Sequence, residues 1–225
     1  MAAAAKEDAA ARKDADGDKR GRILHAAMSI FCERGFAAAT TLEIATRARV
    51  SKRELYALVG NKQEMLVACI AERSSKRLVA PADMPVPRDR ETLARVLASF
   101  GTQIVREVSD PTVVAVFRLA IAEAVNAPEV AQTLESVGRE TSRAALRQMI
   151  AHAEAAGLLE GQPAQLAERF LGLLWGDLMV RLLLGVAERP GADEIAARAR
   201  SAAAAFLQLH PSPGATTGTT VRPRR

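Results

Sequence analysis

Five side chains in the first quarter of the sequence have the chemistry to bind a nucleic acid. Lys52 and Arg53 are neighbours, and Tyr56 follows three residues after Arg53. Lysine and arginine form the commonest specific contacts with guanine in the major groove, and a tyrosine hydroxyl can donate a hydrogen bond to a phosphate. Thr40 and Thr41 offer two more hydroxyls a short distance upstream. These residues are the first candidates for a DNA-binding site.

The charge distribution favours the same region. The whole chain carries a formal charge of +5, whereas residues 19–62 alone contain nine basic and three acidic residues. A positive cluster on an otherwise nearly neutral chain is typical of proteins that bind polyanions, because neutralised phosphates release condensed counterions. Charge alone leaves a second interpretation open, since a solvated basic surface without a partner has the same composition.

Signals for helix starts flank the candidate residues. In a capping box, a polar side chain accepts a hydrogen bond from the N–H of a Glu three residues later, and that Glu reaches back to the cap. The sequence has three such pairs: Thr40 with Glu43, Ser51 with Glu54, and Asn61 with Glu64. With the amphipathic spacing upstream and Gly35 as a left-handed cap, they predict helices over about 20–34, 41–48, 52–59 and 62–78.

The second and third of these helices are short and are separated by only a sharp turn. That arrangement predicts a helix-turn-helix motif, whose second helix enters the major groove of DNA. Helical periodicity turns Leu55 and Leu58 towards the neighbouring helices and leaves Lys52, Arg53 and Tyr56 on the outer side. The first two helical positions, from which this motif contacts bases, are therefore basic.

Residues 30–66 read IFCERGFAAATTLEIATRARVSKRELYALVGNKQEML and resemble the DNA-binding segment of the TetR family of transcriptional regulators. The family pattern is a helix ending in RGF, a Thr-rich helix start, an IA-x-x-A-x-VS turn, LY and a closing K-x-x-x-L. The resemblance implies that Lys52 and Arg53 contact bases or the groove. It implies phosphate contacts for Tyr56, Thr40 and Lys62.

Two further arginines belong to the predicted DNA contacts. The resemblance implies that Arg22, in the basic arm before the first helix-turn-helix element, reaches the DNA backbone or the minor groove. Arg49 lies in the turn between the two short helices, where the family usually has glycine. If this turn needs a left-handed backbone, the side chain of Arg49 costs on the order of 1 kcal/mol.

The remaining two thirds of the chain also read as helical. The composition is rich in alanine and only 4% aromatic, which favours an all-α fold. Proline and glycine positions predict five more helices, over about 89–108, 111–126, 128–156, 163–188 and 192–209. Such a bundle can enclose a ligand cavity. The candidate lining residues are Phe100, Ile104, Phe117, Met149 and Trp175, although plain core packing explains the same residues.

The last two predicted helices are apolar on nearly all sides, so each needs a partner on more than one side. The resemblance implies that they pair with their copies in a second subunit as a four-helix dimer interface. The candidate interface residues are Phe170, Leu174, Leu178, Leu182, Ile195, Ala199 and Phe206. A monomeric core is the alternative. A two-fold homodimer also suits DNA, because it presents two recognition helices to two half-sites.

Together these observations predict a disordered tail over 1–18, a helix-turn-helix DNA-binding domain over 19–66, a ligand-binding and dimerisation domain over 67–210, and a disordered tail over 211–225. The expected function is a cytoplasmic repressor that leaves a palindromic operator when it binds a small, largely apolar effector. No cofactor, metal or membrane contact is expected. An interaction protein without specific DNA binding is the alternative. An enzyme is disfavoured, because no nucleotide-binding, hydrolase or metal-ligand pattern occurs.

Overall fold

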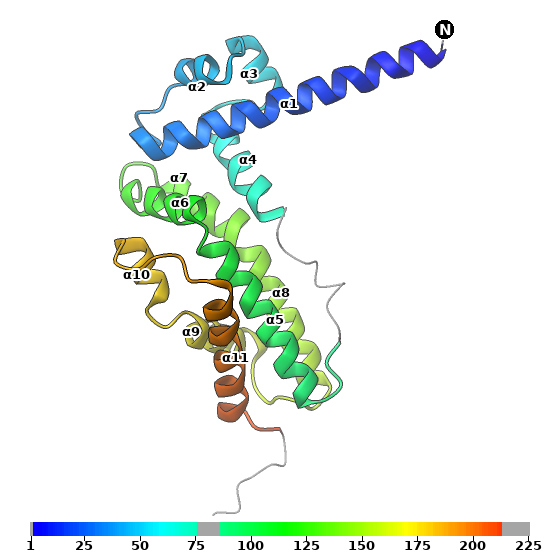
Figure 1. Ribbon diagram of the computed structural model, residues 1–225, viewed down its shortest axis with the longest axis vertical. Coiled ribbons are helices and arrows are strands. Elements are labelled where there is room, and N and C mark those ends of the chain that lie inside the picture. The colour runs from blue at the N-terminus through cyan, green and yellow to red at the C-terminus, as the bar shows by residue number, and fades with distance from the viewer. Residues whose placement is uncertain (1, 76–85, 213–225) are drawn as a thin grey trace, which may run out of the picture. The chain divides into compact units, whose positions relative to one another are not determined.

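The computed structural model describes the backbone of residues 2–75 and 86–212, with side chains over 16–72 and 86–212. Every element in these ranges is a helix, which confirms the all-α prediction (Figure 1). The elements are α1 (Ala2–Arg34), α2 (Thr41–Ala48), α3 (Lys52–Leu58), α4 (Lys62–Ser75), α5 (Arg90–Val108), α6 (Pro111–Ala122), α7 (Pro128–Thr133), the π-helix η2 (Leu134–Arg139), α8 (Glu140–Ala155), α9 (Pro163–Trp175), α10 (Leu178–Leu184) and α11 (Ala192–Leu209).

Contacts within the chain divide it into two compact units. The first comprises residues 1–77 and 112–141, so α6, α7 and η2 belong to the same unit as α1–α4. Helices α2, α3 and α4 all contact α1, and Figure 1 shows α2 and α3 lying along its C-terminal half. Phe31, Ile44, Leu55 and Leu66 bring one fully buried side chain from each of α1–α4 into a common core.

The extent of this unit differs from the predicted DNA-binding domain over 19–66. Val116 and Leu119 of α6, and Val130 of α7, are buried in the same core as the helix-turn-helix residues. The core residues of α1–α4 that they contact lie far away in the sequence. Helical periodicity therefore predicts that α6 and α7 have apolar faces, but it does not predict which core those faces join.

The second unit comprises residues 78–111 and 142–225, in which α11 packs against α5 and α9. The rings of Phe170 and Phe206 meet edge to face with centroids 5.6 Å apart. Arg90, at the start of α5, fixes the end of α11: its guanidinium donates hydrogen bonds to the carbonyl of His210 at 3.0 Å and to that of Leu207. The same side chain also reaches the carbonyl of Leu158 at 2.8 Å.

Helix α1 is longer than the sequence pattern indicates. It begins at Ala2, whereas the prediction was a disordered tail over 1–18 and a helix from about residue 20. The first residues are mostly alanine, which has the highest intrinsic helix propensity, so a helix that has formed further along can extend back through them. Of the C-terminal tail predicted over 211–225, residues 213–225 lie outside the described part of the chain.

The single helix predicted over 163–188 is interrupted at Gly176. This glycine has φ 48° and ψ −122°, a conformation that a residue with a Cβ rarely adopts, and α9 ends there. Arg198 of α11 donates to the carbonyls of Leu174 and Trp175 at 3.2 and 3.3 Å, which satisfies acceptors left open at the helix end. No helix in the described ranges is long and apolar enough to span a membrane.

Candidate nucleic-acid interface

Local hydrogen bonds determine where α2 and α3 begin. Thr40 Oγ1 accepts from the N–H of Glu43 at 3.3 Å, and Glu43 Oε2 accepts from the N–H of Thr40 at 3.2 Å. Ser51 and Glu54 form the same reciprocal pair at 3.1 and 2.9 Å. These bonds satisfy N–H groups that have no partner within the helix. Asn61 and Glu64 pair in the same way at 3.0 and 2.6 Å. All three predicted capping boxes are therefore confirmed, and the one at Ser51 places Lys52 and Arg53 in the first turn of α3.

The turn between α2 and α3 depends on a left-handed residue. Arg49 has φ 55° and ψ 48°, and it is the one non-glycine residue with positive φ among those described. Its N–H donates to the carbonyl of Thr46 at 3.2 Å, and the N–H of Val50 donates to that of Ala45 at 3.0 Å. The conditional expectation for Arg49 is therefore met: its backbone is strained, and its side chain is exposed beside the start of α3.

Replacing Arg49 with glycine is expected to raise the free energy of unfolding while weakening DNA binding. Relief of left-handed strain stabilises the folded protein by about 1–2 kcal/mol. The greater freedom of glycine in the unfolded chain offsets about 0.4–1 kcal/mol of this gain. A net gain of roughly 0.5–1 kcal/mol should appear in urea denaturation. Arg49→Ala is the matched control, because it loses the same charge but keeps the strain. Equal unfolding free energies for the two variants would contradict the strain at Arg49.

Helix α1 is tied to α3 by basic side chains. Lys19 Nζ lies 2.6 Å from Glu54 Oε1, and Arg20 Nη1 donates to the carbonyl of Leu58 at 3.2 Å. The hydrogen bond from Lys19, with those from Ser51, lowers the pKa of Glu54 to about 2, so the capping carboxylate stays ionised at neutral pH. Lys19 and Arg20, which lie just before Arg22 in the same basic segment, therefore orient α3.

Two further ion pairs tie α2 to α1. Arg47 pairs with Glu33 at 2.6 Å and also donates to Ser29 at 2.9 Å. The hydrogen bond from Arg47, followed by that from Ser29, lowers the pKa of Glu33 to about 2. Arg34 pairs with Glu43 at 2.6 Å. Each of these pairs neutralises a cation that the sequence count included in the basic cluster.

Lys62 lies in a different setting from the predicted phosphate contact. Its ammonium donates to the carbonyls of Phe36, Ala37 and Ala39 at 2.8, 3.1 and 3.3 Å, and it lies 4.6 Å from the centroid of the Phe36 ring. An ammonium has three protons, so these three carbonyls use all of them. In this structure Lys62 holds the loop between α1 and α2, and its three protons are all used there.

Glu123, in the turn directly after α6, supports the same loop, a role that the sequence did not reveal. The residue is only 8% exposed, and its Oε1 lies 3.5 Å from the N–H of Ala37. It also occupies the space beside Gly35, where a Cβ would lie 2.4 Å from the carboxylate oxygen. Gly35 has φ 82°, so glycine is required there for both conformation and space. The loop before α2 is thus fixed from two sides, by Lys62 and Glu123.

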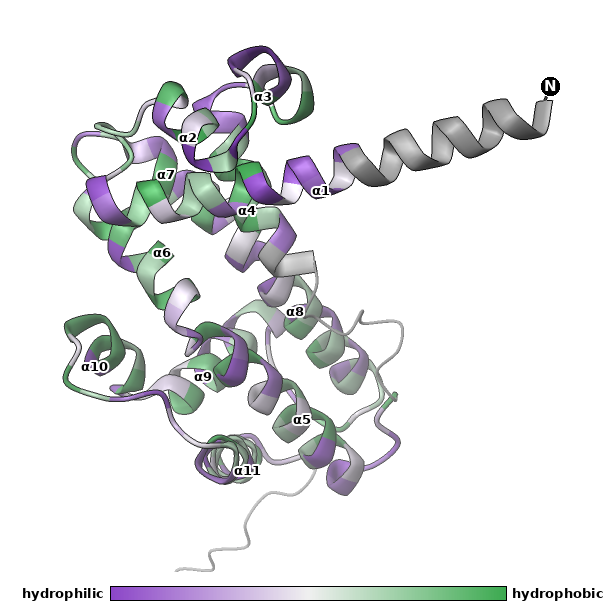
Figure 2. Ribbon diagram, turned by 45° about the horizontal axis from the view of Figure 1, so that its top comes forward, coloured by the Kyte–Doolittle hydropathy of each residue, from purple (hydrophilic) through white to green (hydrophobic). Residues whose placement is uncertain are grey.

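The outer face of α3 carries the exposed candidates. Lys52, Arg53 and Tyr56 are exposed, while Leu55 is fully buried, as the periodicity predicts. The α3 ribbon is accordingly hydrophilic over its first turn and hydrophobic towards its end (Figure 2). Tyr56 Oη lies 3.3 Å from Thr41 Oγ1, so the predicted contacts on α2 and α3 meet.

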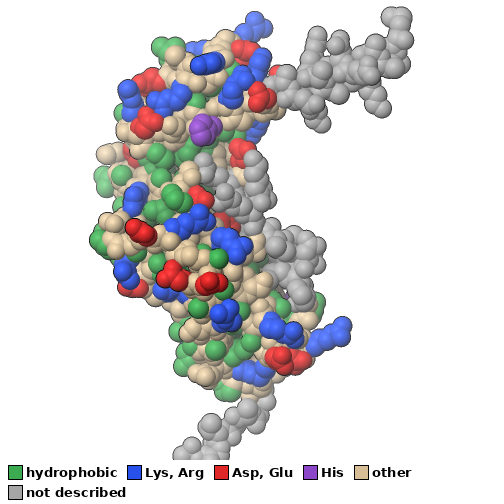
Figure 3. All heavy atoms as spheres, viewed as in Figure 1, with side chains coloured by type: hydrophobic (Ala, Val, Ile, Leu, Met, Phe, Trp, Pro, Cys, Tyr) green, Lys and Arg blue, Asp and Glu red, His purple; other side chains and the backbone are tan. Residues whose placement is uncertain are grey.

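The free cations on this surface are few. Figure 3 shows Lys and Arg side chains interspersed with acidic ones over the helix-turn-helix elements, in keeping with the ion pairs above. Arg22, a predicted contact, pairs with Asp18 at 2.7 Å. Within the described part of the chain, the side chains of Arg49, Lys52 and Arg53 form no ion pair or hydrogen bond, which leaves their charges available.

The residues predicted to line a ligand pocket do not form one group. Phe100, Ile104 and Met149 are buried, and Trp175 is partly buried, all in the second unit. Phe117 belongs to the first unit, where it packs against the core of the helix-turn-helix. Phe117 thus belongs to a different unit from the other four residues, and a cavity shared by all five stays a prediction.

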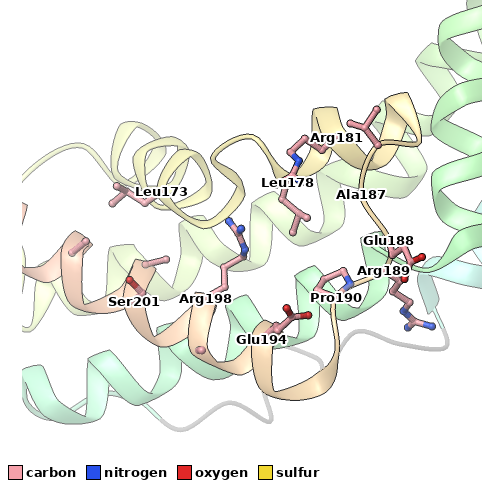
Figure 4. A pocket seen from close by; sticks show the side chains of 14 residues that line it. Leu173, Leu178, Arg181, Ala187, Glu188, Arg189, Pro190, Glu194, Arg198 and Ser201 are labelled. Atoms are coloured by element: carbon pink, nitrogen blue, oxygen red, sulfur yellow. The ribbon is translucent and has the colours of Figure 1, made fainter.

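The second unit has a groove elsewhere, of about 1010 Å³, between α11 and the α9–α10 segment. Leu173, Leu178 and Ser201 contribute to its lining, and Arg198 extends from α11 across it towards the break after α9 (Figure 4). None of the five predicted pocket residues lines this groove.

The seven residues predicted for the dimer interface are buried inside the single chain. Phe170, Leu174, Ala199 and Phe206 have no exposed surface, and Leu178, Leu182 and Ile195 retain 6, 5 and 2%. They pack α9, α10 and α11 within their own unit, which leaves them almost no surface for a second subunit. The helices bury some of their large apolar side chains in this way and leave others, such as Leu173 and Leu184, exposed.

Comparisons with known proteins agree with this architecture. Residues 23–69 match the family model described as bacterial regulatory proteins of the tetR family. Residues 95–210, just over half of the chain, match the model of the AefR-like transcriptional repressor C-terminal domain. The chain belongs to the TetR family. It is accordingly a DNA-binding transcriptional regulator of the repressor type, which confirms the family predicted from residues 30–66.

Individual TetR-family relatives cover most of the chain. A TetR transcriptional regulator from Agrobacterium tumefaciens is 30% identical, with a TM-score of 0.68 over 86% of this chain and 95% of that one. The flavonoid-responsive regulator FrrA is 28% identical, with a TM-score of 0.71 over 88% of this chain and 100% of that one. The HTH-type transcriptional regulator YvkB of Bacillus subtilis is 24% identical over 164 residues, 73% of this chain and 83% of YvkB.

Proposed function

We propose that this TetR-family regulator acts as a homodimer on a palindromic operator, with α3 of each subunit in a major groove. Lys52 and Arg53 contact bases, while Tyr56, Thr41 and Arg49 contact phosphates. Lys62 is left out of this set because its ammonium is fully used in the loop before α2. Thr40 is left out because its hydroxyl and its N–H both donate to Glu43.

The observation that carries this proposal is the position of Lys52 and Arg53. Both are exposed in the first turn of α3, and neither has an acidic partner in the described part of the chain. A helix N-terminus carries a partial positive charge, so a cation there is unfavourable by about 0.3–1 kcal/mol. Two adjacent cations at this place reduce the stability of α3. Negatively charged phosphates and the acceptor atoms of guanine in bound DNA would offset this unfavourable interaction.

DNA binding and its salt dependence test the proposal directly. Selection from a pool of random duplexes is expected to enrich a two-fold symmetric site with half-sites about one helical turn apart. The logarithm of the binding constant should then fall with the logarithm of salt concentration, with a slope of about −0.9 for each phosphate contacted. Failure to enrich any sequence, together with a salt-independent affinity, would contradict the proposal.

The dimer surface proposed for this chain is the outer side of α9, α10 and α11. Leu173, Val180 and Leu184 are 37, 57 and 70% exposed, although they lie on helices whose other faces are buried. Leu173 borders the groove described above, and the small exposed residues Ala197 and Ser201 line it from α11. Small side chains allow a second helix to approach closely, and exposed apolar patches mark association surfaces.

Leu173→Glu is expected to convert the dimer into a monomer, because a carboxylate without a partner is costly to bury in an apolar interface. Sedimentation velocity at micromolar concentration measures the change, and operator affinity should fall with it. Val125→Glu is the control, since Val125 is 90% exposed and belongs to the other unit. A Leu173→Glu protein that stays dimeric would exclude this surface.

The effector is proposed to be largely apolar and to bind in the second unit. Phe100, Ile104 and Met149 give that unit an apolar interior, and the related FrrA is named as flavonoid-responsive. An effector that binds the DNA-incompetent state more tightly shifts the population away from the operator. Flavonoids should therefore release the protein from its operator in a fluorescence-anisotropy titration, whereas sugars and sugar phosphates should not. Release by polar compounds alone would contradict an apolar site.

A further inference from the structure

Leu42 is an exposed leucine in the first turn of α2. It is 64% exposed, whereas the core-facing side of α2 consists of the buried residues Ile44, Ala45 and Ala48. Single exposed leucines are common on protein surfaces and need no explanation by themselves. The argument for a role of Leu42 therefore depends on its neighbours.

The residue before Leu42 belongs to the proposed DNA-binding face. This preceding residue is Thr41, whose Oγ1 lies 3.3 Å from Oη of Tyr56 on the outer face of α3. Leu42 is also in the first turn of α2, held in place by the capping box of Thr40 and Glu43. Its carbonyl accepts a hydrogen bond from Thr46 Oγ1 at 2.9 Å, so the backbone that carries the side chain is fixed.

We infer that Leu42 is a specificity-determining residue that contacts the C5-methyl group of a thymine in each half-site. This inference rests on the proposed DNA binding by α3. Thr41, Lys52 and Arg53 offer a hydroxyl and two cations, which suit phosphates and guanine, whereas Leu42 adds an exposed aliphatic side chain. Thymine is the one base that offers an apolar group in the major groove, and apolar side chains recognise it there.

Deoxyuridine provides a test that removes only the methyl group, because it pairs with adenine as thymine does. Each thymine pair of the selected operator is replaced symmetrically by deoxyuridine, and affinity is measured for the wild type and for Leu42→Ala. Loss of one buried methyl weakens binding about fourfold, so two half-sites give roughly fifteenfold at one symmetric position. The wild type should show this loss, and Leu42→Ala should bind thymine and deoxyuridine operators equally at that position.

Leu209→Ala is the matched control, since Leu209 is 65% exposed on α11, and it should keep the wild-type response at every thymine. Leu42→Ala should melt at the wild-type temperature, because little buried surface is lost and alanine favours the helix. An unchanged deoxyuridine response in Leu42→Ala would overturn the inference, as would equal weakening on both operators, which indicates a sugar contact. If the wild type binds no duplex with a salt-dependent affinity, the proposed function itself fails.

Discussion

The double substitution Lys52→Ala with Arg53→Ala is expected to weaken operator binding roughly a thousandfold and to erase the preference for the operator over random DNA. A good contact from arginine or lysine to a base is worth about 1–3 kcal/mol, and tenfold in affinity corresponds to about 1.4 kcal/mol. Both residues are exposed and unpaired within the described part of the chain, so no folded-state contact is lost with them. Electrophoretic mobility shift or anisotropy titrations measure the effect.

The stability of this double variant separates a DNA-binding role from a structural one. Alanine has a higher helix propensity, and removal of two cations from a helix N-terminus relieves repulsion, so the unfolding free energy should stay level or rise by several tenths of a kcal/mol. Arg88→Ala with Arg200→Ala removes two exposed arginines outside the helix-turn-helix and should leave sequence preference intact. Wild-type operator affinity in the Lys52/Arg53 double variant would refute the assignment of α3 as the recognition helix.

Phe206→Ala is expected to destabilise the second unit by about 3–5 kcal/mol, the cost of removing a large aromatic side chain from a packed core. Phe206 has no exposed surface, and its ring meets those of Phe170 and His210 at centroid distances of 5.6 and 4.9 Å. Urea denaturation followed by circular dichroism, repeated at several protein concentrations, distinguishes this loss from weakened dimerisation.

The loss of stability depends on whether the substituted residue of α11 is buried or exposed. Leu209→Ala, three residues further along, removes a side chain that is 65% exposed and should change the unfolding free energy by no more than about 0.5 kcal/mol. If Phe206→Ala left the unfolding of the monomer unchanged and raised only the dimer dissociation constant, Phe206 would belong to the subunit interface after all.

Leu173 and Phe206 are both apolar residues of the C-terminal helices, yet opposite outcomes are expected for their substitution, and helical periodicity does not predict this difference. The sequence shows that α9, α10 and α11 carry more apolar residues than one face can bury, and it correctly indicates that these helices pack on several sides. It does not show which face meets the chain's own core. The structure assigns Phe170 and Phe206 to that core and leaves Leu173 and Leu184 outside.

The basic cluster shows a similar limit. Residue counting treats Lys19, Arg47 and Lys62 as equivalent to Lys52, yet the first three are held by partners between 14 and 35 residues away. Only the folded chain brings these partners together. The number of cations available to DNA is therefore smaller than the charge count indicates.

The sequence by itself determined the starts of α2, α3 and α4, the sharp turn at Arg49 and the outward position of Lys52 and Arg53. Each of these depends on interactions within about four residues, namely reciprocal capping bonds and the helical period, so local chemistry is sufficient. Tertiary structure alone decided that Lys62 and Glu123 hold the loop before α2, that Gly176 divides the predicted helix over 163–188, and which apolar side chains stay exposed. Those outcomes depend on contacts between residues far apart in the chain, whose energies exist only after the helices have packed.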